Sequence, residues 1–173
     1  ALVDGARTAL GVVAATACAG IIVGVVVKTG LGLALANSLV KLAGGSIMLT
    51  LFLVMIASLV LGMGAPTTAN YVITSTIAAP AILTLLAPNT PMELVPLVTV
   101  MSAHFFVFYF GIIADITPPV ALAAFAASGI SGGDPIKTGV HSAKLAIAAF
   151  IIPYMIVLQP ALLMVDVTIL QIV

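Results

Sequence analysis

Two segments of the sequence interrupt otherwise apolar runs. Residues 62–70 read Gly-Met-Gly-Ala-Pro-Thr-Thr-Ala-Asn, and residues 111–119 read Gly-Ile-Ile-Ala-Asp-Ile-Thr-Pro-Pro. Glycine and proline at these places break or bend helices. Irregular backbone at membrane depth is tolerated only inside protein or beside a wet cavity, because lipid offers no hydrogen-bond partners. Paired breaks of this kind indicate a transporter's binding site.

The composition supports a membrane protein. Of the 173 residues, 63% are hydrophobic and 6% are charged, whereas a soluble domain carries about a quarter charged residues. Five basic residues balance five acidic ones, so the clustered basic face that nucleic-acid binding needs is missing. The partner that this composition predicts is the lipid bilayer, and nucleic acid is excluded.

The first half of the sequence predicts helices of unequal length. Residues 8–27 are long enough to span a bilayer, whereas residues 30–42 suit a linking or interfacial helix. Residues 46–61 reach only ~24 Å as a helix, short of a ~30 Å core. With residues 66–87 they predict a re-entrant hairpin, and two full spans joined by a tight turn are the alternative.

The second half predicts a discontinuous helix and a further span. Residues 94–110 form its first piece, and Thr117 is expected to cap the second piece with Pro118 at its first position. A last span from about residue 137 is expected to bend or end at Pro153 or Pro160. The whole is an all-α polytopic membrane domain, which we divide into residues 1–45, 46–87, 94–130 and 137–173.

Basic residues predict the orientation. Lys137 and Lys144 flank the loop at Gly132 and Gly133, whereas residues 88–93 contain no Lys or Arg. Cytoplasmic loops carry the excess of positive charge, so the first loop is assigned to the cytoplasmic side. His141 lies between the two lysines and is expected to face lipid headgroups.

Each break offers two kinds of ligand. Carbonyl groups at the end of the first half-helix can bind a cation, and N–H groups at the start of the second favour an anion. Na⁺ is a hard ion that prefers oxygen. Asp115 could ligate a cation, accept a proton or cap the next helix, and simple kinking is the alternative for the glycines and prolines. His104 is expected to be a hydrogen-bonded packing residue rather than a proton relay.

The sequence contains no recognisable catalytic set. It lacks a metalloprotease helix motif, a phosphate loop and a Cys/His metal cluster, and Cys18 stands alone. Aspartyl protease chemistry needs two adjacent carboxylates. Asp115 is the one carboxylate deep in the apolar part of the sequence, and Asp166 is distant from it. We therefore predict no enzyme activity and no organic cofactor.

Three stretches resemble one transporter family. Residues 61–71, 115–121 and 101–105 are similar to the large membrane subunit of TRAP transporters (tripartite, ATP-independent, dependent on a periplasmic binding protein). They look most like fused permeases that pair with TAXI-type binding proteins, and the resemblance runs from about Gly11 to Pro160.

The resemblance implies an elevator-type fold of two inverted repeats, of which this chain is roughly the second; the sequence is expected to be part of a longer permease. It implies uptake of a carboxylate-bearing organic solute with Na⁺ as coupling ion, in the bacterial inner membrane. The implied partners are a periplasmic solute-binding protein and the small TRAP membrane subunit or its fused equivalent.

The motifs carry candidate site residues with them. The predicted Na⁺ ligands are Gly62, Gly64, Pro66, Thr67, Gly111, Asp115 and Thr117. The predicted substrate-binding residues are Thr67, Thr68, Asn70, Thr117 and Pro118. A Na⁺- or H⁺-coupled dicarboxylate or citrate carrier without a binding protein is the alternative, and a non-transporting membrane protein or an intramembrane protease is a more distant one.

Overall fold

The chain is built from helices. The computed structural model describes residues 2–62, 67–119 and 121–165, and within them every regular element is an α- or 3₁₀-helix. The prediction of an all-α protein is therefore confirmed. The elements are α1 (Leu2–Thr29), α2 (Leu31–Leu42), α3 (Ile47–Gly62), α4 (Thr67–Ile77), α5 (Ala79–Leu86), η1 (Met92–Leu94), α6 (Leu97–Ile113), η2 (Ala114–Ile116), α7 (Leu122–Ser131), α8 (Pro135–Leu145), α9 (Ile147–Leu158) and η3 (Pro160–Leu163).

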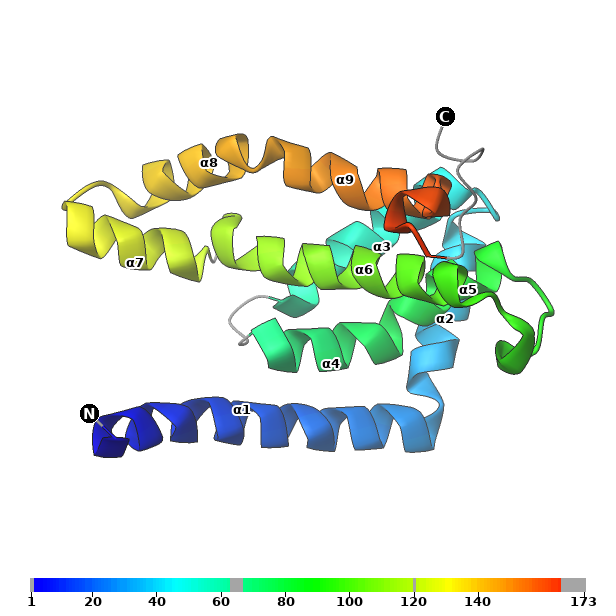
Figure 1. Cartoon of the computed structure of the whole chain (residues 1–173), viewed down its shortest axis with the longest axis horizontal. Helices are drawn as coiled ribbons and strands as arrows, with labels where there is room; N and C mark the ends of the chain where they lie inside the picture. Colours follow the sequence, from blue (N-terminus) through cyan, green and yellow to red (C-terminus); the bar gives the residue numbers. More distant parts are fainter. Residues whose placement is uncertain (1, 63–66, 120, 166–173) are drawn as a thin grey trace.

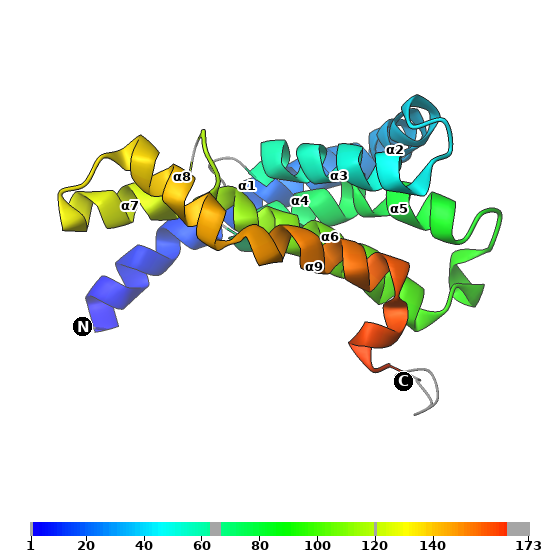
Figure 2. The same ribbon diagram turned by 90° about the horizontal axis from the view of Figure 1, so that it is seen from above.

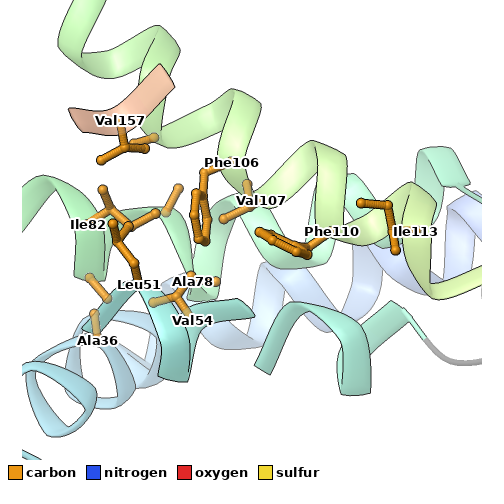
Figure 3. Packing of buried hydrophobic residues seen from close by; sticks show 13 residues of the cluster. Ala36, Leu51, Val54, Ala78, Ile82, Phe106, Val107, Phe110, Ile113 and Val157 are labelled. Atoms are coloured by element: carbon orange, nitrogen blue, oxygen red, sulfur yellow. The ribbon is translucent and has the colours of Figure 1, made fainter. Parts of the chain in front are cut away.

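Helix α6 is the centre of the bundle (Figure 1), where it packs against α3, α4, α5 and α9. The core around it holds Phe106 and Phe110, both without exposed surface (Figure 3). Tyr154 of α9 stacks edge-on against Phe106 with ring centres 5.1 Å apart. Its hydroxyl donates a hydrogen bond to the sulfur of Met55 at 3.3 Å, which ties α9 to α3. The core thus joins helices from both halves of the sequence.

Two stretches of the described chain are long and apolar enough to cross a membrane. They are Thr67–Leu86, which comprises α4 and α5, and Leu97–Ile116, which comprises α6 and η2. Two bent pairs raise the number to four if each counts as one span: residues 20–29 with α2, bent by 73°, and α8 with α9, bent by 41°. The chain is a multi-pass membrane protein, and its many exposed large apolar side chains suit contact with lipid.

A proline explains the break between α4 and α5. Pro80 lacks an N–H group and its ring excludes the carbonyl of Thr76 from a helical hydrogen bond, so α4 ends at Ile77. The freed carbonyl faces Gly32 of α2, where an added Cβ atom would lie 2.6 Å from the oxygen. Only glycine lets α2 approach this closely, so the break is also a packing contact.

The last span ends where expected but bends elsewhere. Helix α9 ends at Leu158, just before Pro160, which begins η3. Pro153 lies buried inside α9, and the bend falls at Ala146, whose ψ of 12° departs from the helical value. Figure 2 shows α7 and α8 extending together beyond the central helices at one end of the molecule. Gly139 makes this possible, because its missing side chain leaves room for Pro118 and Ala121, which a Cβ atom would meet at 3.3 and 3.4 Å.

Candidate functional site at the two helix breaks

The side chain of Asn70 joins the end of α3 to the last turn of α6. This residue lies in the first turns of α4 and has no exposed surface. Its Nδ2 atom donates a 2.9 Å hydrogen bond to the carbonyl oxygen of Gly111 in α6. Gly62, the last residue of α3, adjoins the same amide, since an added Cβ atom would lie 2.5 Å from Nδ2. One amide therefore connects the ends of α3 and α6.

The other atom of this amide is unpaired. Oδ1 of Asn70 is buried and has no hydrogen-bond partner among the described residues. Leaving a buried acceptor unpaired costs about 1–3 kcal/mol. Because this chain has few polar side chains, a buried oxygen beside two helix ends is a candidate ligand for a cation.

Gly111 does not form the break that the sequence analysis expected. Helix α6 continues through it to Ile113, and η2 extends the helical path to Ile116. Glycine only lowers helix propensity, by about 1 kcal/mol, and does not by itself end a helix. Its role here is spatial, because a Cβ atom at Gly111 would lie 2.9 Å from Nδ2 of Asn70.

The second break begins at Thr117, and its predicted capping role is wrong. Thr117 adopts extended backbone angles, as expected before a proline, but α7 starts only at Leu122, after Ala121. Two successive prolines postpone the helix, so neither Thr117 nor Asp115 is its cap residue. The Thr117 hydroxyl instead donates a 2.7 Å hydrogen bond to the carbonyl of Ile113, at the end of α6.

A small hollow lies between α3 and the second break. Its volume is about 190 Å³. Its walls come from α3 and from residues 114–118, and they are formed by Ile56, Leu59, Val60, Ala114, Thr117 and Pro118. Two predicted site residues, Thr117 and Pro118, thus share one hollow with the last turns of α3. Asp115 is half-buried in η2 and does not line it.

The chain matches one protein family over nearly its whole length. The model of the tripartite ATP-independent periplasmic transporter, DctM component, matches residues 1–170. The chain belongs to the DctM family. No curated protein and no solved structure shows significant similarity to it. The family is one of transporters that act without ATP, so this DctM-family chain belongs to the membrane permease component of a TRAP-type secondary transporter.

Several predicted site residues of this DctM-family chain stand apart from the Asn70 contact. Thr67 and Thr68 lie exposed in the first turn of α4. Gly64 and Pro66, with the rest of residues 63–66, lie outside the described residues, as does Asp166. The structure therefore brings Gly62, Asn70 and Gly111 together, and it places Thr117 and Pro118 beside the neighbouring hollow.

His104 pairs with Tyr71 on the other side of α4. The Tyr71 hydroxyl and Nδ1 of His104 are 3.0 Å apart, and both rings line an apolar hollow of about 510 Å³ with residues of α6. The hydrogen bond agrees with the packing role predicted for His104. Tyr71 follows Asn70 directly, so adjacent residues of α4 contact two different stretches of α6.

Sequence reasoning missed the polar residues of α3. Thr50 and Ser58 are fully buried, and their hydroxyl oxygens have no hydrogen-bond partner among the described residues. They share one face of α3 with Gly62, because residues four positions apart line up along a helix. This regular spacing of small and polar residues in an otherwise apolar helix was the available signal.

Proposed function

We propose that the transporter containing this chain imports a carboxylate-bearing organic solute together with Na⁺, and that Na⁺ binds at Asn70, where the ends of α3 and α6 meet. One observation carries the proposal: the buried Asn70 amide joins the end of α3 to the end of α6. Carboxyl ends of helices carry partial negative charge. Two such ends beside a buried, unpaired carbonyl oxygen favour a small cation.

The chemistry of the ligands supports Na⁺ rather than a transition metal. In residues 2–62, 67–119 and 121–165 no group of three or more His, Cys, Asp or Glu residues could hold a metal ion. The available atoms are Oδ1 of Asn70, backbone carbonyls and the Thr117 hydroxyl, whose oxygen keeps lone pairs while its proton is donated to Ile113. Neutral oxygen ligands suit a hard ion of low charge.

The start of α4 supports a site for the solute's carboxylate. Helix amino ends carry partial positive charge and unpaired N–H groups. Thr67 and Thr68 add exposed hydroxyl groups in this first turn. We infer that Na⁺ at Asn70 fixes the start of α4 against the end of α3 and thereby completes the anion site. The loaded part then moves relative to its scaffold and carries both ligands across the membrane.

The family description makes the transporter tripartite, so further components act with the DctM component. We propose that a periplasmic solute-binding protein delivers the substrate and that a small membrane subunit, or its fused equivalent, completes the permease in the bacterial inner membrane. Uptake by the reconstituted transporter should then stop when the binding protein is left out. Undiminished uptake without it would favour a carrier of the dicarboxylate or citrate type.

The Na⁺ site can be tested by melting the purified transporter. Its Tm should rise with NaCl and not with KCl at equal ionic strength, because an ion that binds only the folded state stabilises it. Thr117→Val should weaken the apparent Na⁺ affinity by roughly tenfold. This is the loss expected when one polar contact to a charged group is removed. Asn70→Leu, which removes the amide, should abolish the Na⁺-specific rise.

A matched control is available in α5. The Thr84 hydroxyl donates a 2.8 Å hydrogen bond to the carbonyl four residues earlier, as the Thr117 hydroxyl does, but lies away from both breaks. Thr84→Val should leave the Na⁺ response unchanged. If Thr117→Val and Thr84→Val behave alike, or if KCl raises Tm as much as NaCl, the proposed Na⁺ site is wrong.

A further inference from the structure

A further hollow borders the second break at Pro118. It sits at the joint between α8 and α9 and has a volume of about 320 Å³. Its walls are apolar except for one lysine, and they are formed by Pro118, Val140, Ala143, Lys144, Ile147 and Phe150. The proposed transport site does not include this hollow. Pro118 lines both this hollow and the smaller one beside α3.

Helix α8 presents two adjoining stripes beside the hollow. Lys137, His141 and Lys144 are exposed and spaced by four and three residues, so they form one cationic stripe. Ile136 and Val140 are exposed on the neighbouring face, and Ile147 continues that apolar stripe past the bend. An amphipathic helix with a basic face is typical of the boundary between lipid tails and headgroups.

The polarity changes at the same joint. Helix α9 is apolar throughout, whereas α8 contains both lysines and the histidine. The one carboxylate at the start of α8, Asp134, accepts a 2.8 Å hydrogen bond from the backbone N–H of Lys137. It thereby caps the helix at the end opposite Lys144. The hollow thus lies where the surface changes from polar to apolar, with the cation of Lys144 at its rim.

We propose that this hollow binds an anionic phospholipid, with its phosphate at Lys144 and an acyl chain against Val140, Ile147 and Phe150. The lysine stem can lie along the apolar wall while its ammonium group reaches the headgroup. Basic pockets beside membrane helices on the cytoplasmic side are suited to anionic lipids. The charge of α8 selects an anionic headgroup over a zwitterionic one.

Through Pro118, a lipid bound in this hollow can affect the transport site. Pro118 lines the hollow at α8 and α9, and it also lines the smaller hollow beside α3. A bound acyl chain therefore contacts the same proline that borders the candidate site. Occupancy of one hollow should restrict the movement of the break on its other side.

Lipid binding can be measured by native mass spectrometry of the purified transporter titrated with phosphatidylglycerol or phosphatidylcholine. The wild type should retain phosphatidylglycerol preferentially. Lys144→Gln should weaken that binding by about fivefold, the contribution of one lysine near an anionic headgroup. Lys41→Gln is the control, since Lys41 is an exposed lysine on α2. Val140→Phe fills the hollow and should reduce retention of the lipid by its acyl chain.

The outcomes separate this site from general attraction to charge. Equal retention of the two lipids, or equal loss in the Lys144 and Lys41 variants, would overturn the proposal. Inorganic phosphate that competes as well as the lipid would show a phosphate site without an acyl-chain requirement, which also contradicts it. Because the readout is lipid retention, a transporter that binds no Na⁺ would leave this test unaffected. Should Val140→Phe fail to fold, the Lys144 comparison still decides.

Discussion

Replacing Gly111 with alanine should destabilise the protein through a single contact. The new Cβ atom would lie 2.9 Å from Nδ2 and 3.4 Å from Cγ of Asn70, closer than packed atoms ordinarily approach. Asn70 cannot simply rotate away, because it is fully buried and its amide is hydrogen-bonded to Gly111 itself. Overpacking costs about 1–3 kcal/mol, and loss of the hydrogen bond adds about 1 kcal/mol.

The matched control is Gly24→Ala in α1. No atom outside its own helix lies within 4 Å of a Cβ placed at Gly24, so this substitution shows only the helix preference for alanine, about 1 kcal/mol in favour. Gly111 also lies inside a helix, so this preference cancels between the two variants, which should differ by about 2–4 kcal/mol in unfolding free energy. For a chain of this size that is roughly 4–16 °C in Tm. Thermal unfolding of the purified protein in detergent measures the difference.

A double substitution isolates the contact. In an Asn70→Ala background the atoms that crowd Gly111 are gone, so Gly111→Ala should no longer destabilise the protein. The coupling between the two sites should then be of the order of the clash itself, about 1–3 kcal/mol. If Gly111→Ala costs the same with and without the Asn70 side chain, or melts like Gly24→Ala, the contact between Asn70 and Gly111 is refuted.

Three further substitutions test the fold around the site. Gly32→Ala should lower the unfolding free energy by about 1–3 kcal/mol, because its Cβ would lie 2.6 Å from the Thr76 carbonyl oxygen. Gly20→Ala should not lower it, because no atom outside its own helix lies within 4 Å of that Cβ. Melting curves of the two variants compare them. Asp134→Ala should cost about 1 kcal/mol by removing the cap of α8, and Asp134→Asn should restore most of it, as measured by chemical unfolding. Phe106→Ala, at a fully buried position, should lower the unfolding free energy by about 3–5 kcal/mol. In the same assay Phe52→Ala should lower it by less than half as much, because Phe52 is 48% exposed.

The positions of the breaks could be predicted from the sequence, but their contacts could not. The end of α3 at Gly62 and the interruption at Thr117–Pro119 follow from glycine and proline, whose effects on backbone are local. The pairing of Asn70 with Gly111 joins residues 41 positions apart and depends on how α4 packs on α6. Local rules therefore assigned Gly111 to a turn and Thr117 to a cap, and tertiary packing gave both a different role.

The buried faces of α3 and α6 carry small and polar residues beside apolar ones. In a soluble protein the apolar side of a helix faces the core, but in a membrane both lipid and core are apolar, so hydrophobic periodicity does not separate them. In α3 the buried line contains Thr50, Ser58 and Gly62, and in α6 the buried side includes Ser102 and Gly111. Small residues let backbones approach, and polar ones find protein partners that lipid lacks. The contact at Asn70 forms where these two lines meet, because its amide lies against both Gly62 and Gly111.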